Sequence, residues 1–224
     1  MAEYLLRLYD DRLGAKKAPE QNYLSENRVL YVCDGMATIK NQATTAVTLS
    51  ENSAWYSADE TSVAGGADGA HLLRYELVKA GADENDGLIT GIGVSSTLLY
   101  QAEVNLTPGD DYLIRCDRVD IPPSGIAYTH THQGPGIRCL LNGGFTVETQ
   151  GHKTSIDAGE AWFEAGPDPV LAYASDYRPG NFSRVMILPR NLLGKSSISY
   201  VNTEDASKPK LQRYTIFIDE FITI

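Results

Sequence analysis

An internal repeat is the sequence feature that most constrains the fold of this chain. The matched segments are 28–41 with 136–149, 48–58 with 155–165, and 71–78 with 182–189. In this alignment Gly35 falls on Gly143, and Trp55 falls on Trp162, the only other tryptophan. The glycine-to-tryptophan spacing is 20 residues in the first copy and 19 in the second. Two copies at matched spacing predict two related modules.

The hydrophobic period within these modules is that of β-strands. In the stretch YLIRCD, Tyr112, Ile114 and Cys116 would share one face of a strand, and the residues between them would share the other. Similar short runs, bounded by Gly, Asn, Asp or Pro, recur along the chain. Residues 3–13 are compatible with a helix or with a first strand. The fold class is therefore predicted to be all-β.

Composition along the chain divides it into three parts. We expect a β module over residues 1–100, a second over 101–190, and a loop with a C-terminal strand over 191–224. That strand would pack on a module or on the second subunit of a homodimer. The acidic, glycine-rich segment 79–87 and the polar segment 192–210 are the predicted connections.

Charge and cysteine content exclude several classes of partner. The formal net charge of −10 disfavours binding to nucleic acid and to anionic membrane surfaces. Cys33, Cys116 and Cys139 form no CxxC pair, as expected for thiols in a reducing compartment. No run approaches the length of a membrane span, and the N-terminus does not resemble a signal peptide. We therefore expect a cytoplasmic protein with a small-molecule ligand.

Two histidines form the main candidate for chemistry. His130 and His132 are separated by one residue, so on a strand both imidazoles would point to the same face, and Tyr128 would share that face. Such a pair can bind one metal ion from one side of a sheet. The alternative is that both are ordinary core or surface histidines.

The surrounding sequence resembles a known superfamily. Residues 122–147, PPSGIAYTHTHQGPGIRCLLNGGFTV, are similar to the first motif of the cupins, and residues 155–170, SIDAGEAWFEAGPDPV, to the second. The resemblance implies a bicupin of two jelly-roll β-barrels, the first of them degenerate. It also implies a single divalent metal ion (Zn, Fe, Mn or Ni) held by the HxH pair, a glutamate and a histidine of the second motif.

This sequence departs from that ligand set at two positions. Counting back from Gly143 places the motif's glutamate at Gly136 or Ile137, and the second-motif histidine falls near Val170. Glu164 is the candidate replacement, because an inward-facing Glu164 would complete a two-histidine, one-carboxylate set. The alternative is that Glu164 faces solvent.

Arg138 shares the strand face that would have carried the missing glutamate. A buried guanidinium needs an anion, so Arg138 would either pair with Glu164 or bind a substrate carboxylate. Tyr128 and Tyr173 are expected to line the substrate pocket, and Trp162 is more simply explained as core packing.

These expectations leave several functions open. The first is a metal-dependent enzyme of dioxygenase, isomerase or lyase type that acts on a small carboxylate. The others are a protein that binds or senses a small ligand without turnover, and a structural barrel without metal.

Overall fold

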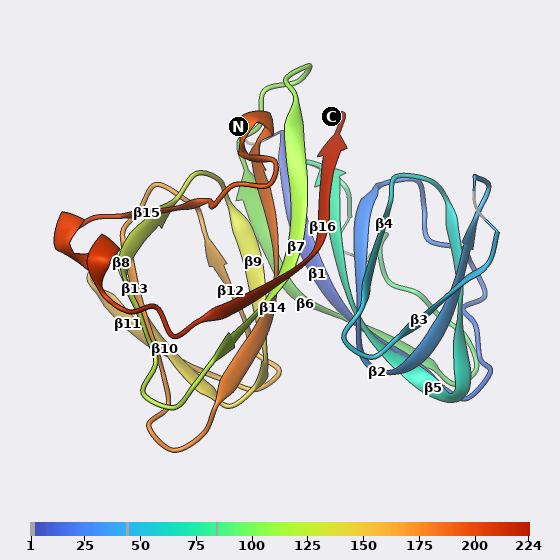
Figure 1. The fold of residues 1–224 in the computed structure, drawn as a ribbon. Coiled ribbons are helices and arrows are strands. Elements are labelled where there is room, and N and C mark those ends of the chain that lie inside the picture. The colour runs from blue at the N-terminus through green and yellow to red at the C-terminus, as the bar shows by residue number, and fades with distance from the viewer. Residues whose placement is uncertain (1–2, 44, 84) are drawn as a thin grey trace. The chain divides into compact units, whose positions relative to one another are not determined.

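The computed structural model describes residues 3–43, 45–83 and 85–224. The described residues are mostly β-strands, with two short 3-10 helices (Figure 1). The chain divides into two compact units, one ending at Leu106 and the other beginning at Thr107. All strand pairs are antiparallel in the part of the chain that is described.

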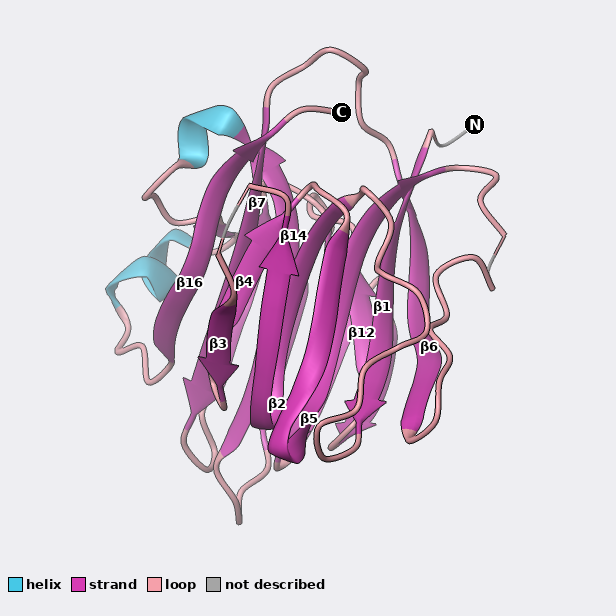
Figure 2. Cartoon of the chain, turned by 90° about the vertical axis from the view of Figure 1, so that its right-hand side faces the viewer, coloured by secondary structure: helices cyan, strands magenta, loops and turns pink. Residues whose placement is uncertain are grey.

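The described part of the first unit forms a six-stranded sheet. Its strands are β1 (Tyr4–Leu13), β2 (Asn27–Asn41), β3 (Val47–Ser50), β4 (Ala54–Ser57), β5 (Thr61–Lys79) and β6 (Val94–Val104). The sheet order is β3-β2-β5-β1-β6, and β4 also pairs with β2 (Figure 2). Residues 3–13, compatible with helix or strand from the sequence, lie almost entirely in β1, which pairs with both β5 and β6. The unit extends beyond residue 100 because β6 continues to Val104.

The second unit contains two five-stranded sheets. The first comprises β12 (Ala161–Glu164), β9 (Gly136–Asn142), β14 (Gly180–Pro189), β7 (Tyr112–Ile121) and β16 (Arg213–Ile222), in that order. The second comprises β11 (His152–Asp157), β10 (Gly144–Thr149), β13 (Val170–Ala174), β8 (Ile126–His132) and β15 (Ile198–Tyr200). The 3-10 helices η1 (Arg190–Leu192) and η2 (Thr203–Ser207) flank β15. The C-terminal strand β16 pairs with β7 of the same unit.

Apolar side chains from both sheets form the core of the second unit. Phe145, Trp162 and Phe182 lie at its centre, with ring centroids 5.2–5.8 Å apart. Phe145 comes from one sheet and the other two from the opposite sheet. The prediction of an all-β chain is confirmed. The sheets nevertheless remain open and do not close into barrels, because β12, β16, β11 and β15 end their sheets without joining one another.

The strand registers confirm the internal repeat. Leu30 pairs with Trp55 in the first unit, and Arg138 pairs with Trp162 in the second. Gly35 and Gly143 both have positive φ, of 73° and 87°. A Cβ at Gly143 would lie 2.6 Å from the Pro179 carbonyl oxygen, so this position requires glycine.

One part of the sequence alignment was wrong by a single residue. The ladders pair Leu30 with Arg74 and Arg138 with Arg184. The repeat therefore superposes Arg74 on Arg184, whereas the aligned segments 71–78 and 182–189 superposed Arg74 on Val185.

Among the described residues, no helix has the length and apolar character needed to cross a membrane.

Candidate metal centre

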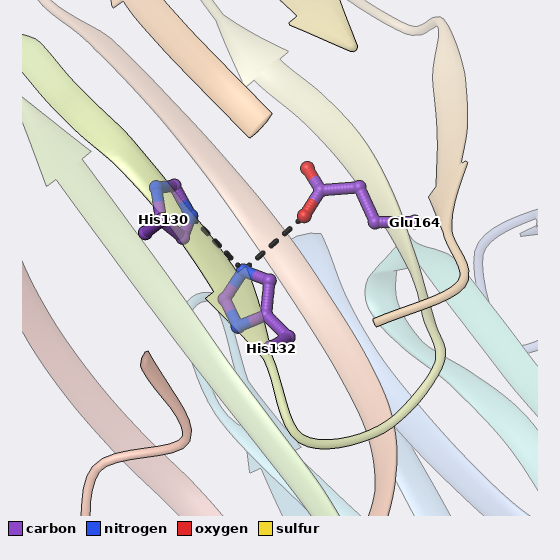
Figure 3. Close-up of side chains that lie close together, drawn as sticks. All are labelled: His130, His132 and Glu164. Carbon is purple, nitrogen blue, oxygen red and sulfur yellow. Dashed lines mark hydrogen bonds and ion pairs between the residues drawn. The ribbon is translucent and has the colours of Figure 1, made fainter. Parts of the chain in front are cut away.

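Three buried side chains of the second unit converge on one point (Figure 3). His130 and His132 lie on β8, where the period of two places both imidazoles on the inner face. Glu164 is the last residue of β12, in the opposite sheet. The donor atoms of the three residues all lie within 4.8 Å of one another. The candidate centre thus joins the two sheets of the unit.

Two of the three distances between the donor atoms match those of ligands that share one ion. His130 Nε2 lies 3.2 Å from His132 Nε2, and His132 Nε2 lies 3.2 Å from Glu164 Oε2. Two ligand atoms about 2.1 Å from one ion, at angles of about 90–110°, would be separated by about 3.0–3.4 Å. The three residues therefore form a two-histidine, one-carboxylate set that leaves further coordination positions open.

Hydrogen bonds to the outer ring nitrogens orient both imidazoles. His130 Nδ1 lies 2.7 Å from the Tyr128 carbonyl oxygen, which can only accept, so Nδ1 carries the proton and the Nε2 lone pair faces the centre. His132 Nδ1 lies 3.4 Å from Ser197 Oγ, a longer contact. In metal-binding histidines, too, the outer ring nitrogen is hydrogen-bonded and the inner nitrogen faces the ion.

Burial keeps both imidazoles neutral. It is the main cause that lowers the pKa of His132 to about 3, and the charges of Arg138 and Arg184 act in the same direction. Burial likewise lowers the pKa of His130. The contact between His132 and Glu164 is therefore not a charged ion pair near neutral pH. Neutral imidazole is also the form that binds a metal ion.

Glu164 is held as a carboxylate by its surroundings. Burial acts to raise its pKa, but the Arg138 charge, the adjacent His132 imidazole and the hydrogen bond from Trp162 outweigh burial and hold the pKa well below its ordinary value. Trp162 Nε1 donates to Glu164 Oε1 at 2.9 Å. Oε2 lies 2.7 Å from Arg138 Nη2, yet it accepts no well-aligned hydrogen bond from the described residues. Oε2 is thus the carboxylate atom available to an ion.

Glu164 lies directly across the strand ladder from Gly136, the position at which the cupin motif has a glutamate. Gly136, where the sequence pattern expects a glutamate, is the ladder partner of Glu164. Paired residues on adjacent strands direct their side chains to the same face, with Cβ atoms about 5 Å apart. A Cβ at Gly136 would lie 2.6 Å from the Val185 carbonyl oxygen, so a side chain there would displace β14. The carboxylate comes from the neighbouring strand instead.

Arg138 forms the ion pair that was one of its two predicted roles. Its side chain is only 1% exposed, and Nη1 donates to the Gly136 carbonyl oxygen at 2.6 Å. With Nη2 beside Glu164, the guanidinium neutralises the carboxylate of the candidate centre. Arg184 lies nearby and is itself neutralised by Asp117, to which it donates at 2.9 and 2.6 Å.

Two adjacent cavities surround these groups. The three donor residues, Arg138 and Arg184 line a cavity of about 30 Å³, which is the volume of one water molecule. A larger cavity of about 270 Å³ shares three wall residues with it: Arg184, Ile198 and Tyr214. A small molecule in the larger cavity would therefore lie next to the candidate centre.

The structure places the two predicted pocket tyrosines elsewhere. The Tyr128 ring lies under Lys208 and Lys210, 5.0 and 5.3 Å from their ammonium groups, so it contributes to the centre through its carbonyl oxygen. The Tyr173 hydroxyl donates to Glu148 at 2.9 Å. Tyr173 alternates with the buried Ala172 and Ala174 and therefore faces away from the core.

Sequence reasoning missed several residues of the site. Arg184 and Asp117 pair on neighbouring strands, and a correctly registered repeat would have shown that both modules carry an arginine there. Ser197 lies in the polar segment 192–210, which has no strand pattern, and Tyr214 begins a predicted C-terminal strand whose partner the sequence did not identify.

Comparison with known proteins identifies the fold. No family model matches the chain, and no curated protein matches it in sequence. A variant of oxalate decarboxylase from Bacillus subtilis is similar in structure, with a TM-score of 0.65 and 14% identity over 91% of this chain and 73% of the other. AerE from Microcystis aeruginosa has a TM-score of 0.59 and 11% identity over 83% of this chain and 88% of the other.

Both neighbours are cupin-fold proteins, so the fold of this chain is of the cupin type. A further structure of the Bacillus enzyme, with a TM-score of 0.64 and 13% identity over 91% of this chain and 73% of the other, is described as containing Mn(II) centres. At these identities the likeness concerns the fold alone.

Proposed function

We propose that the second unit binds one divalent metal ion through His130, His132 and Glu164. The observation that carries this proposal is the convergence of two oriented imidazole nitrogens and a carboxylate oxygen, in which His132 Nε2 lies 3.2 Å from each of the other two donor atoms. The Mn(II) centres of the oxalate decarboxylase neighbour support a divalent ion on this fold and favour Mn among the candidates. Oxygen and nitrogen donors together suit Mn, Fe and Zn.

The proposed ligand of the larger cavity is a small carboxylate. Of the described residues, four cations line this cavity: Arg115, Arg184, Lys195 and Lys210. Asp219 and Asp117 neutralise the two arginines, whereas no carboxylate of the described residues forms a salt bridge with either lysine. The cavity is thus locally positive in a chain of net charge −10, and an anion would balance it.

When bound, the ion would supply a Lewis acid beside the substrate. Side chains that line the larger cavity would bind and position the substrate. Lys210, whose ammonium group donates to the carbonyl oxygens of Asp205 and Lys208, would attract the carboxylate through its charge. Ser197 would connect the substrate cavity with the outer nitrogen of His132. These features fit a metal-dependent enzyme of the dioxygenase, isomerase or lyase type.

The internal repeat supports a duplicated cupin architecture as part of this proposal. Each module contributes equivalent strands around a tryptophan, but only the second supplies the HxH pair. We infer a bicupin in which the first module has lost the metal ligands. Ser57 stands in the first unit where Glu164 stands in the second, because Ser57 pairs with Arg28 as Glu164 pairs with Gly136.

Metal analysis tests the proposal directly. Untagged protein, purified without a metal column, is expected to contain about one equivalent of divalent metal or to bind one equivalent of added Mn²⁺ in calorimetry. His132→Ala is expected to weaken this binding by about 100-fold. The matched control is His152→Ala, because His152 is exposed at the start of β11.

Two results would contradict the metal site. One is metal binding that survives both His130→Ala and His132→Ala, and the other is no binding of Mn²⁺, Fe²⁺ or Zn²⁺ by folded protein. The second result, combined with thermal stabilisation by small carboxylates, would favour a binding protein without turnover. The observation that favours a binding protein without metal is the ion pair of Arg138 with Glu164, because it neutralises the carboxylate in the absence of a metal ion.

A further inference from the structure

A second cavity, in the first unit, has the chemistry of a ligand site. Its volume is about 230 Å³, and it lies between residues 21–24 and 26 on one side and residues 82 and 86–89 on the other, beside β1 and β5. Among the described residues, its charged wall residues are Arg7, Arg74, Glu26, Glu76 and the exposed Asp86. No histidine is among its described wall residues, so it is chemically distinct from the candidate metal centre.

Arg7 is a buried cation without a carboxylate partner among the described residues. It is 1% exposed. It donates to Gln101 Oε1 at 2.7 Å and to the carbonyl oxygens of Ala82 and Asp83 at 2.7 and 2.9 Å, with a longer contact of 3.4 Å to the Tyr9 hydroxyl. None of the described carboxylates forms an ion pair with it. These four contacts leave one N–H of the five in a guanidinium for a ligand.

The charges behind Arg7 do not balance it. Arg74 pairs with Asp11 at 2.6 Å and with Glu76 at 2.8 Å, and Arg28 pairs with Glu76 at 2.6 Å. Arg7 takes no part in these ion pairs between the described residues. A buried charge without a paired carboxylate is costly, so Arg7 favours a bound anion.

Glu26 supplies the opposite charge on the same cavity. It is half-buried and forms no ion pair with a cation of the described residues. Burial, followed by the charge of Glu76, raises the pKa of Glu26 above its ordinary value. A cationic group of a ligand would stabilise the ionised form of this carboxylate. The remaining wall includes the apolar side chains of Leu24, Val78, Leu88 and Ile89.

We propose that this cavity binds a small zwitterion of the α-amino acid class with an apolar side chain. The ligand carboxylate would face Arg7, its ammonium group would face Glu26, and its side chain would contact the apolar wall. The inference rests on the buried Arg7 and the half-buried Glu26, which line one cavity together with the exposed Asp86 and form no ion pair with any described residue. A ligand with either single charge would leave the other group of the protein uncompensated.

Three related probes separate the contributions of the two charges. L-leucine has both groups, 4-methylpentanoate lacks the ammonium, and 3-methylbutylamine lacks the carboxylate. Calorimetric titration uses the full chain after removal of metal with EDTA, because an amino acid can also chelate an ion at the candidate metal centre. Leucine is expected to bind at least about tenfold more tightly than either analogue. His132→Ala is expected to leave leucine binding unchanged.

Two variants assign the contacts. Glu26→Gln is expected to reduce leucine binding to the level of 4-methylpentanoate and to leave binding of 4-methylpentanoate unchanged. Arg7→Met is expected to abolish binding of both carboxylates. Because Arg7 also fixes the carbonyl groups of residues 82 and 83, this variant can unfold, and Glu26→Gln then decides the matter alone.

The proposal is overturned by any of three results in folded protein. They are no binding of the three probes, equal affinity for leucine and its two analogues, and leucine binding that Glu26→Gln leaves unchanged. None of these outcomes depends on the metal site of the second unit, so this proposal and the proposed metal site can fail separately.

Discussion

Replacing Arg138 by methionine tests whether the guanidinium and a metal ion compete for Glu164. Arg138 Nη2 lies 2.7 Å from Glu164 Oε2, the oxygen that an ion would bind. Without metal, the variant leaves Glu164 buried without a countercharge, which costs about 3–5 kcal/mol of unfolding free energy. The metal-free Arg138→Met protein is therefore expected to be much less stable than the parent.

With metal, the same substitution is expected to have the opposite effect on affinity. A dication and a guanidinium about 5 Å apart repel each other by several kcal/mol, even at an effective dielectric constant of about 20. Since relaxation recovers part of this energy, the metal is expected to bind at least about tenfold more tightly, which corresponds to about 1.4 kcal/mol. Metal should thus stabilise the variant more than it stabilises the parent.

Urea unfolding with EDTA and with saturating Mn²⁺ measures both effects, and calorimetry gives the affinities. Arg118→Met is the control, because Arg118 pairs with Asp120 at 2.7 Å in the same unit but is 23% exposed. Its loss should cost about 1 kcal/mol or less and should not alter metal-induced stabilisation. If Mn²⁺ stabilises Arg138→Met no more than the parent, the ion and the guanidinium do not share Glu164.

Three further predictions concern other parts of the chain. Trp162→Phe keeps an aromatic ring but removes the hydrogen bond to Glu164 Oε1, so metal affinity, measured by chelator competition, should fall about tenfold; unchanged affinity would exclude an orienting role. Burial opposes ionisation of Glu76, but its two arginine partners hold its pKa below 4.5. The stability that this ion pairing contributes should be complete above about pH 4.5 and lost at lower pH, and urea unfolding of Glu76→Gln should show a smaller loss. A thiol reagent should modify Cys33 before Cys116, whose burial raises its pKa; mass spectrometry that finds Cys116 modified first would contradict this order.

The period-two alternation of side chains along a strand is sufficient to predict the two histidines of the candidate centre. It places His130 and His132 on one face of a strand, and both are buried with their Nε2 atoms together. The same rule also argues against Tyr173 as a pocket residue, because its neighbours Ala172 and Ala174 are the buried ones. For Tyr173, position in the strand alternation is thus a better guide to the direction of the side chain than its aromatic character.

Strand register explains what the sequence left open. Val170, the position that corresponds to the second-motif histidine, is the ladder partner of His130, but a valine side chain cannot bind a metal. Whether Glu164 turned inward could not be decided by counting, since it depends on the pairing of β12 with β9. Ser197 and Tyr214 lie on a segment whose path is fixed by pairing with β8 and β7 and not by its own pattern.

The position of the carboxylate at Glu164, and not at Gly136, determines the net charge of the candidate centre. At Glu164 the carboxylate is adjacent to Arg138, so the two neutral histidines, the carboxylate and the guanidinium together carry no net charge. An ion bound there would keep nearly all of its double positive charge. Such a centre would hold its metal less tightly than one with an unshared carboxylate, but it would attract an anion from the adjacent cavity more strongly. Because the same charge that weakens the metal also favours the anion, the two ligands are expected to support each other's binding. Glu164, Arg138 and the two lysines of the larger cavity would then act as one electrostatic unit, through which a chain of net charge −10 would present the proposed local site for carboxylates.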